Sequence, residues 1–368
     1  MKLHVVRDLN GIEALKQRWT ELDQDHPFRS FDWYFSWFEH CSSGEAPYVI
    51  TDQNTQSETQ MIAPFYSTTT RLGGRKLCLA ADGHVCTDYG QIASHDLRFE
   101  SNISNLMWWL ASGDPWHNHA YCEFDGLPQN CSTTLSTLSE LNRVGFEPEI
   151  FELQNCWEVG LPETWEELNA RFSKKHRRKT KKALSNLDNC EVHSLADSDF
   201  DSLWPEFVRL HQMRRTQVGD PGCFADSNFE RFLRHATRRL GRRDLADVHI
   251  VESKNQPVAA SLSFFSPTKT FMYQTGFDPG FSKLEPGYML IVAALRQAIA
   301  RRHRYFDFMR GDEPYKQRWN ADAVPMLKLR FRIHDSFRNR IEDRLRWSRD
   351  ILKSSFKQLR GQSQYAGA

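Results

Sequence analysis

The sequence predicts an α/β (α+β) fold arranged as two successive lobes. The chain has 368 residues, which favours two domains or one duplicated fold over a single small core. Residues 1–155 show short strands with helices between them, and residues 156–335 repeat this alternation. Hydrophobic residues make up 40% and charged residues 26% of the chain, which is typical of a folded, soluble protein. We expect residues 336–368 to form a separate helical tail.

Composition and charge argue against several classes of protein. The net charge is only +1, so attraction to a charged partner must come from local clusters of charge. The sequence contains no apolar run of the length that spans a bilayer, and its first residues lack the apolar stretch of a secretion signal. The eight cysteines are scattered, without the spacing of a zinc site. We therefore expect a cytoplasmic protein with reduced thiols and no bound metal.

In the first lobe, short β-favouring runs bounded by glycine or polar residues predict strands, and runs with helical periodicity predict helices. The predicted strands are residues 3–6, 48–51, 61–66, 72–83, 87–93 and 119–128, with a polar hairpin tip at 53–60. The predicted helices are residues 12–25, 31–40 and 101–113.

In the second lobe, a group of helices precedes a meander of three strands. The predicted helices are residues 164–187, 203–218 and 224–241, and the last of these has Asp226 or Ser227 as its cap and Gly241 as its stop. The meander strands are residues 246–253, 257–266 and 270–277. A long apolar helix opened by Pro286 follows, and the last strands are residues 305–309 and 326–333.

The start of the apolar helix is a candidate phosphate site. Proline suits the first helical turn, and glycine lets a ligand approach the backbone closely. The free N–H groups of such a turn attract a phosphate or pyrophosphate. The alternative is an ordinary helix that happens to begin with proline. The candidate cofactor-binding residues are Pro286, Gly287, Tyr288 and Met289.

The region before the meander carries a dense cluster of positive charge. Eight of the twelve residues from 171 to 182 are Lys or Arg, and a helix would place the uncharged face of Phe172, His176, Thr180, Ala183 and Leu187 opposite them. Like charges repel on a helix surface, so a solvated face is strained and an anionic partner is the alternative: a nucleotide, CoA phosphates, tRNA or a phospholipid-linked sugar. The candidate anion-binding residues are Lys174, Lys175, Arg177 and Arg178.

The tail combines apolar residues at three- and four-residue steps with eight Lys and Arg residues between 336 and 360. One interpretation is a helix that packs on the body of the chain. The other is a basic amphipathic helix that rests peripherally on an anionic membrane surface, at the inner face of the membrane.

The segment FDFMRGDEPYKQRW, residues 306–319, is the strongest candidate for a catalytic loop. It places one acid inside a strand and follows it with a loop that is rich in ionisable groups between large aromatic residues. A surface hairpin with a charge network is the alternative. The candidate catalytic residues are Asp307, Asp312, Glu313 and Tyr315 as bases or proton donors, and Arg310, Lys316 and Arg318 are candidates to hold a charged substrate.

These motifs together resemble the CelD/BioF2-like acetyltransferases of the GNAT superfamily, which are related to the FemAB peptidyltransferases. The resemblance rests on Tyr273–Pro279, Pro286-Gly287 and the run from Phe306 to Lys316, and on the basic helix. In the first lobe it rests on FDWY at residues 31–34, IAPF at 62–65 and TDYG at 87–90. It covers roughly residues 1–335.

The resemblance implies two tandem GNAT-like lobes, each a mixed, mostly antiparallel sheet flanked by helices. It implies transfer from acetyl-CoA or another acyl-CoA to an amine, such as an amino sugar of exopolysaccharide or cell-envelope biosynthesis. It also places Tyr273 and Asp278 in the substrate site. In FemAB relatives the donor is aminoacyl-tRNA instead. The usual GNAT pyrophosphate signature is absent, since the helix start here is KLEPGY.

The leading hypothesis is therefore direct N-acyl transfer. Asp307 or Asp312 would take the proton of the amine, with Glu313 as a weaker candidate, and Tyr315 or Tyr288 would protonate the leaving thiolate. Two alternatives remain. One is a FemAB-like transferase that uses aminoacyl-tRNA, and the other is a non-catalytic scaffold held at a membrane by residues 336–360.

Overall fold

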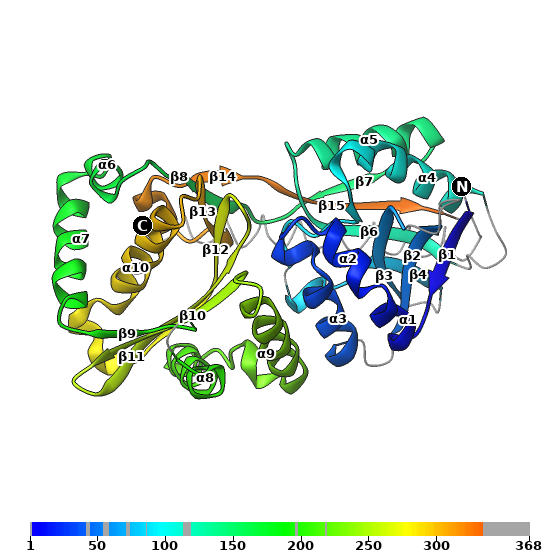
Figure 1. The fold of residues 1–368 in the computed structure, drawn as a ribbon. Helices are drawn as coiled ribbons and strands as arrows, with labels where there is room; N and C mark the ends of the chain where they lie inside the picture. The colour runs from blue at the N-terminus through cyan, green and yellow to red at the C-terminus, as the bar shows by residue number, and fades with distance from the viewer. Residues whose placement is uncertain are drawn as a thin grey trace, which may run out of the picture.

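A computed structural model describes residues 2–41, 45–53, 59–70, 74–85, 87–112, 119–195, 198–217 and 219–333. Two lobes lie side by side, and each is a mixed sheet with helices on both faces (Figure 1). The predicted α/β class with two sheet-and-helix lobes is confirmed. The predicted tail helix lies outside the described residues.

The first sheet has the order β1-β2-β3-β4-β6-β15-β7, with β5 paired to β3. Helices α1, α2 and α3 cover one face, and α4 and α5 cover the other. Its strands are β1 (Lys2–Val6), β2 (Ala46–Gln53), β3 (Met61–Thr69), β4 (Arg75–Leu79), β5 (Ala93–Ser94), β6 (His119–Pro128), β7 (Glu149–Glu152) and β15 (Met326–Arg332). The helices are α1 (Leu9–Ala14), α2 (Lys16–Leu22), α3 (Phe31–His40), α4 (Phe99–Ala111) and α5 (Ser132–Val144).

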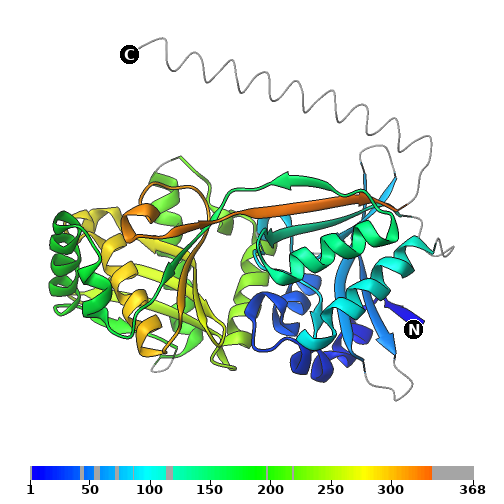
Figure 2. The same ribbon diagram turned by 90° about the horizontal axis from the view of Figure 1, so that it is seen from above.

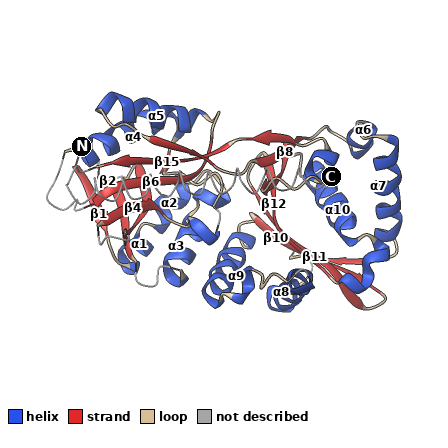
Figure 3. Cartoon of the chain, turned by 180° about the vertical axis from the view of Figure 1, so that it is seen from behind, coloured by secondary structure: helices blue, strands red, loops and turns tan. Residues whose placement is uncertain are grey.

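The second sheet has the order β14-β8-β13-β12-β11-β10-β9. Helices α8 and α9 pack on one face, while α10 packs on the other and carries α6 and α7 outside it (Figure 3). The strands are β8 (Cys156–Gly160), β9 (Glu191–His193), β10 (Ala246–Ser253), β11 (Gln256–Phe265), β12 (Lys269–Phe277), β13 (Tyr305–Arg310) and β14 (Asp322–Val324). The helices are α6 (Trp165–Ala170), α7 (Lys174–Leu187), α8 (Phe200–Gln217), α9 (Ser227–Gly241) and α10 (Pro286–Ala300).

The last strand crosses from the second lobe back to the first. β14 pairs with β8 in the second sheet, and β15, which follows directly, pairs with β6 and β7 in the first (Figure 2). The expected second lobe, residues 156–335, therefore loses this strand to the first sheet. Strand alternation predicted β15 itself, but alternation does not specify which sheet a strand joins.

Most predicted elements are present, but the predicted strand at 87–93 is wrong: residues 87–92 form a turn and loop, and only β5 (Ala93–Ser94) is a strand there. The predicted helix at 12–25 is the pair α1 and α2, and the predicted helix at 164–187 is the pair α6 and α7. Ser173 starts α7 by accepting a hydrogen bond from the N–H of His176, as expected for an N-cap serine. Helix α5 and the short strands β7, β8, β9 and β14 were not predicted.

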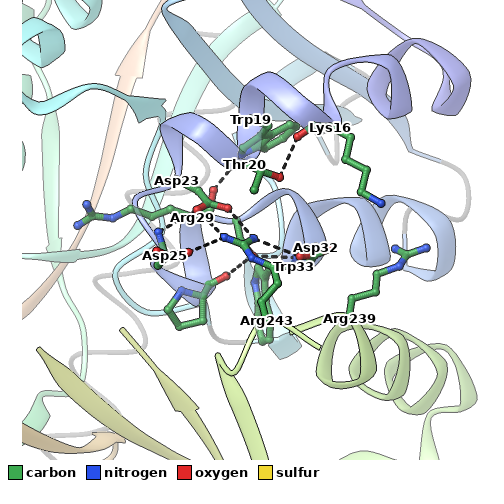
Figure 4. Close-up of polar contacts among 12 residues, drawn as sticks. Lys16, Trp19, Thr20, Asp23, Asp25, Arg29, Asp32, Trp33, Arg239 and Arg243 are labelled. Atoms are coloured by element: carbon green, nitrogen blue, oxygen red, sulfur yellow. Dashed lines mark hydrogen bonds and ion pairs between the residues drawn. The ribbon is translucent and has the colours of Figure 1, made fainter. Parts of the chain in front are cut away.

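The two lobes share one aromatic core. Phe28 and Trp33 of the first lobe contact Phe271 and Phe232 of the second, with ring centroids 5.1 and 4.9 Å apart. A cluster of ion pairs also joins the two lobes beside this aromatic core. Arg243, directly beyond α9, pairs with three carboxylates of the first lobe (Figure 4). Those carboxylates are Asp23 and Asp25, each at 2.9 Å, and Asp32 at 3.2 Å. Among the described residues, no helix is long and apolar enough to cross a membrane.

Candidate active site

Two neighbouring parallel strands of the second sheet separate after three paired positions. The last pair is Phe271 of β12 with Asp307 of β13, although both strands continue beyond it. On β12 the register with β11 shifts by one residue at Tyr273. On β13 the register with β8 shifts after Asp307, where Met309 has a φ of 59°. Such bulges bend a strand and end its pairing, so β12 and β13 diverge next to Asp307.

Asp307 is fully buried where the strands diverge. Its Oδ1 accepts a hydrogen bond of 2.6 Å from the N–H of Met309, and the Tyr89 hydroxyl donates a short hydrogen bond to its Oδ2. The Nζ of Lys269 lies 3.9 Å from Oδ2 but also pairs with Glu158. Burial raises the pKa of Asp307 from 3.8 to about 6, although Lys269 and the hydrogen bonds lower it. A carboxyl with this pKa exchanges protons readily near neutral pH.

The first lobe reaches this carboxyl through the segment that carries Tyr89. The N–H of Tyr89 donates to the carbonyl of Gly126 on β6, at 2.8 Å. Gly126 has a φ of +72°, and a Cβ there would lie 2.3 Å from the carbonyl oxygen of Thr87. A residue larger than glycine would push this segment off β6. Tyr89 is thus held by the first lobe while its hydroxyl belongs to the site of the second.

Arg310 forms a second polar link between the lobes. Its guanidinium donates to the carboxylate of Asp88 at 2.8 Å and to that of Asp125 at 3.3 Å. Asp88 is buried, and burial raises its pKa while Arg310 lowers it. We expected Arg310 to hold a charged substrate, but these two carboxylates of the first lobe engage its guanidinium.

Asp312 lies on the surface beside the linker between the lobes. Its Oδ1 accepts hydrogen bonds from the amide of Asn155 at 3.0 Å and from the indole of Trp157 at 3.2 Å. The Asp312 carboxylate is exposed, whereas the Asp307 carboxyl is fully buried. Of the two candidate bases, Asp307 is the one in a setting suited to proton exchange.

The rest of the loop is split between exposed and internal groups. Glu313 is exposed and pairs with Lys316 at 2.9 Å, and Arg318 is exposed. Tyr315 is 37% exposed and packs its ring against Phe308, and partial burial together with the Glu313 charge raises its pKa to about 12. A phenol with this pKa keeps its proton near neutral pH and can act as a donor.

Lys316 is buried rather than presented to a substrate. Its Nζ donates to the carbonyl oxygens of Met309, Arg310 and Gly311 at 3.0, 3.2 and 2.9 Å. An ammonium group has three N–H donors, and these three carbonyl oxygens and the Glu313 carboxylate together engage all of them. Lys316 thus fixes the end of β13 and the turn that follows it.

The start of α10 offers fewer free N–H groups than its sequence suggests. The amides of Tyr288 and Met289 already donate to the Glu285 carbonyl, at 2.9 and 3.2 Å, and proline has no N–H. Pro286 and Met289 are buried. Gly287 faces open space, with no atom within 4 Å of an added Cβ, and is the best placed of the four residues to meet a phosphate.

Helix α7 turns one face to the protein and the other to solvent, as predicted. His176, Thr180 and Ala183 are buried against α10. Burial and the nearby charges of Lys179 and Arg318 lower the pKa of His176 to about 4, so its imidazole is neutral.

The four anion candidates lie on the opposite face of α7. Lys174, Lys175, Arg177 and Arg178 are all exposed. Within the described part of the chain, the ion pairs do not include any of them, while Lys182, further along α7, lies 3.5 Å from Glu285. The basic surface and the start of α10 are therefore neighbours.

The two remaining candidates have structural contacts of their own. The Tyr273 hydroxyl donates to the carbonyl of Val85 in the first lobe, at 2.7 Å. Asp278 caps the turn after β12 by accepting from the N–H of Gly280, at 2.8 Å. Tyr273 thus lies at the junction of the lobes, and Asp278 lies at the connection from β12 to α10.

Sequence reasoning missed the residues that surround Asp307. Tyr89 entered the sequence analysis only through the TDYG pattern at residues 87–90, and no motif pointed to Lys269 or Glu158. A buried acid inside a strand needs a partner, and a Tyr beside an Asp within a glycine-rich segment could have suggested one. The spacing of 218 residues between Tyr89 and Asp307 gives no local pattern that joins them.

One group of potential metal ligands occurs within the described ranges. Glu39 and His40 of α3 and His235 of α9 place their ligand atoms within 4.8 Å of one another. Glu39 is also paired with Arg239 at 2.9 Å. The group lies on two helices outside the diverging strands, and the expectation of a metal-free reaction stays a prediction.

Residues 170–317 match the family model described as an acetyltransferase (GNAT) domain, in agreement with the acyltransferase class expected from the sequence. The match runs from the end of α6 to the loop after β13 and therefore contains β12, α10 and β13. No curated protein sequence matches the chain.

Solved structures support the same fold over nearly the whole chain. FemX superposes with a TM-score of 0.63 at 12% identity, over 90% of this chain and 97% of its own. The C-terminal domain of a putative lysylphosphatidylglycerol synthetase from Agrobacterium fabrum gives 0.54 at 10% identity, over 88% and 93%. A conserved protein of unknown function from Bacteroides thetaiotaomicron gives 0.55 at 11% identity, over 90% and 100%. The two-lobed fold expected from the sequence is thus confirmed.

Proposed function

We propose that the protein is an N-acyltransferase that moves an acyl group from acyl-CoA to an amine. The observation that carries the proposal is the divergence of β12 and β13 beside a buried carboxyl. Beyond Phe271 the edge of β12 no longer pairs with β13, so its backbone groups are the ones proposed to meet an extended thioester; on β13 the N–H and carbonyl of Met309 already bond to Asp307 and Lys316. The start of α10 follows β12 after the short helix η5 (Pro279–Leu284), and Gly287, which faces open space there, is the proposed contact with the phosphates of CoA.

Asp307 is the base of this proposal, and Tyr89 connects it to the amine. Both the carboxyl and the Tyr89 ring are buried, and the Tyr89 hydroxyl that bonds to Asp307 is the group proposed to meet the acceptor. As the amine attacks the thioester carbonyl, it passes a proton to the Tyr89 oxygen while the Tyr89 proton moves to Asp307. The Asp307 pKa of about 6 keeps the carboxyl ionised at neutral pH and able to accept this proton.

Tyr315 is the proposed proton donor to the leaving thiolate. It keeps its proton at neutral pH, because its pKa is raised to about 12 by burial and by Glu313. The acceptor is proposed to approach from the first lobe, which supplies Tyr89. An amino sugar of a cell-envelope or exopolysaccharide precursor is the proposed class of amine.

Binding and turnover test the proposal separately. Acetyl-CoA should raise the melting temperature of the full chain and release heat in calorimetry, whereas the same concentration of AMP should do neither. Release of free thiol from acetyl-CoA should then depend on an added amino sugar. If acetyl-CoA changes neither melting nor heat, the proposed donor is wrong.

A second candidate donor is aminoacyl-tRNA, and the exposed cations of α7 favour it. A surface that neutralises phosphates binds RNA with an affinity that falls steeply as salt rises. Replacing Lys174, Lys175, Arg177 and Arg178 by Gln should weaken tRNA binding and flatten that salt dependence. Replacing the exposed Arg242 and Lys254 by Gln is the matched control. Equal effects of the two sets would reject the α7 surface as an RNA site.

A membrane role for residues 336–360 remains a third proposal. Flotation of the full chain with vesicles that contain anionic lipid, against a chain that ends at Ile333, measures it directly. Equal flotation of the two forms would reject the tail as a membrane contact.

A further inference from the structure

A glutamate and two histidines meet at the surface where the two lobes join. Glu39 and His40 are the last two residues of α3 in the first lobe, and His235 lies on α9 of the second lobe. Each offers one ligand atom, and the three atoms lie within 4.8 Å of one another. Glu39 and His235 are exposed and His40 is half-buried, so an ion in solution can reach the cluster.

The two imidazole rings already turn one nitrogen each toward the other. Nε2 of His40 lies 2.9 Å from Nδ1 of His235, and the ring planes are nearly perpendicular, at 88°. A tetrahedral zinc ion binds histidine nitrogen at about 2.0–2.1 Å, which places two such nitrogens about 3.3 Å apart. The rings therefore need to separate by only about 0.4 Å to admit the ion. The ring that donates the present hydrogen bond moves its proton to its other nitrogen, so that both lone pairs face the metal.

The helices that carry these ligands are fastened to each other on both sides of the histidine pair. One turn earlier on α3, the Ser36 hydroxyl accepts a hydrogen bond from Arg239 of α9 at 3.0 Å. Just beyond α3, the thiol of Cys41 donates to the carbonyl of Asn228, near the start of α9, at 3.6 Å. The positions of the ligands are thus fixed before an ion arrives, which reduces the entropy that binding must overcome.

Arginines of α9 lie near the cluster, and each has a partner. They are Arg231, Arg234, Arg238 and Arg239. The first bonds to the side chain of Asn228, and the next two share the carboxylate of Asp201. Arg239 pairs with Glu39 at 2.9 Å, but its guanidinium also lies over the ring of Phe35. It therefore keeps a contact when the Glu39 carboxylate turns toward an ion.

The end of α3 contributes favourable electrostatics of its own. The carboxyl end of a helix carries partial negative charge, and Glu39 and His40 occupy this end of α3. Imidazole nitrogen together with a carboxylate suits zinc and related transition-metal ions, whereas magnesium prefers oxygen ligands alone. The ligand atoms therefore select an ion of the zinc type.

We infer that Glu39, His40 and His235 bind a divalent transition-metal ion of the zinc type, with water as the fourth ligand. The bound ion joins α3 to α9 and so links the two lobes. Because the ligands lie at the surface, the ion exchanges with solution, and the link depends on the metal that is available.

The linked helix also holds the segment that reaches the buried acid of the second lobe. The indole of Trp33 on α3 donates to the hydroxyl of Thr87 at 2.9 Å. Thr87 lies two residues before Tyr89, whose hydroxyl bonds to Asp307. The metal site itself lies outside the diverging strands, so the ion takes no part in acyl transfer and the inference does not depend on the proposed donor.

The test is metal binding by the full, untagged chain after EDTA treatment and dialysis. Zinc chloride is titrated in calorimetry, and cobalt chloride reports the ligands through its absorption spectrum. We expect one zinc ion per chain, a higher melting temperature with zinc, and the spectrum of tetrahedral cobalt with nitrogen and oxygen ligands. Magnesium chloride should neither release heat nor change the melting temperature.

Three variants and a matched control locate the site. His40→Gln, His235→Gln and Glu39→Gln should each weaken zinc binding at least about tenfold, because each removes one of three ligands. His95→Gln, which removes another exposed histidine of the first lobe, should bind zinc like the natural chain. Each variant should melt like the natural chain without metal, which separates loss of the site from unfolding.

Several results would overturn the inference. One is zinc binding that the three variants retain, or that His95→Gln loses to the same extent. Another is a thiolate charge-transfer band in the cobalt spectrum, which would place the ion on cysteines. A dimer that forms only with zinc would show that the ligands come from two chains. The cobalt spectrum and the size of the zinc-bound natural chain need no variant, so the inference can fail even if a variant does not fold.

Discussion

The two lobes place a buried acid at the same topological position and surround it with opposite charges. In each lobe two parallel strands pair briefly, and the last paired residue of the second strand is an acid: Glu123 opposite Cys78 in the first lobe, and Asp307 opposite Phe271 in the second. Across the antiparallel side, Glu123 faces Arg330 and Asp307 faces Glu158. The strands repeat, but the charge beside the acid is reversed.

That reversal decides what each acid can do. Burial alone would raise the pKa of Glu123, but Arg330, Lys328 and Lys76 together hold it well below its usual range. For Asp307 burial dominates and the pKa rises to about 6, because Lys269 is shared with Glu158. The first acid is a permanent anion that binds three cations together, whereas the second titrates close to neutral pH.

The backbone differs at the same place. In the first lobe the segment of Tyr89 bonds to β6 beyond the last pair with β4. In the second lobe β12 and β13 remain apart. In the first lobe the segment of Tyr89 thus occupies the position where β4 and β6 diverge. The same segment places the Tyr89 hydroxyl in contact with Asp307. The diverging strands of the first lobe are therefore structural, whereas those of the second lobe leave an unpaired strand edge for the proposed reaction.

Removing the titrating acid should have the largest effect. We expect Asp307→Asn to lower kcat/KM by about 100- to 10,000-fold, the range for a lost general base. The fall of kcat/KM with decreasing pH near pH 6, the acidic limb of the profile, should also disappear. Ionising Asp307 costs stability as the pH rises through its folded-state pKa, so the variant should melt no lower than the natural chain above pH 6. The comparison variant Asp312→Asn should keep the limb; loss of the limb there instead would move the base to Asp312.

Removing the permanent anion should affect stability rather than chemistry. Glu123→Gln leaves three cations with one neutral partner, which should cost about 3–5 kcal/mol in the free energy of unfolding. A depressed pKa stabilises the fold above the usual Glu range and loses that contribution as the pH falls. Denaturant unfolding at several pH values should therefore show a deficit that shrinks on acidification. A deficit independent of pH would mean that lost packing, not charge, is responsible.

The link between the lobes is tested by Tyr89→Phe. The Tyr89 hydrogen bond lowers the pKa of Asp307, so its loss should move the acidic limb of kcat/KM to higher pH. Loss of the proposed proton relay should also reduce the plateau rate about tenfold. A pH–rate profile that superposes on that of the natural chain would leave the first lobe without a role in the reaction.

The smallest expected effect comes from the residue that faces Asp307. The Glu158 charge raises the pKa of Asp307. Glu158→Gln removes that charge, and Lys269 then pairs with Asp307 instead of being shared with Glu158. The acidic limb of the kcat/KM profile should move to lower pH, and the maximal rate should change by less than about tenfold. A shift in the opposite direction would contradict the charge comparison between the lobes.

The sequence was sufficient for the elements whose pattern is local. Helix α10 begins at Pro286 and β10 spans the predicted residues, because each has its own periodicity and boundary residues. Helix α5 also has a local pattern, with Leu135, Leu138 and Leu141 before Gly145, and could have been predicted.

The remaining features depend on pairing between distant residues. Strand β15 has the alternation of any half-buried strand, and its place in the first sheet follows from a register with β6 that lies about 200 residues earlier. The divergence of β12 and β13 depends on bulges opposite β11 and β8. The environment of Asp307 depends on Tyr89, Lys269 and Glu158, which meet only when both lobes are assembled. Sequence reasoning could name the acid but not its pKa.

The return of β15 also governs when this chain can fold during translation. β6 ends at Pro128 and β15 begins at Met326, so ribosomes that add roughly 5–20 residues per second need about 10 to 40 s to make the chain between them. Throughout that interval one edge of β6 has no partner, β7 has no strand to join, and Glu123 lacks two of its three cations. An edge that stays unpaired for so long is open to pairing with other nascent chains until β15 has been made.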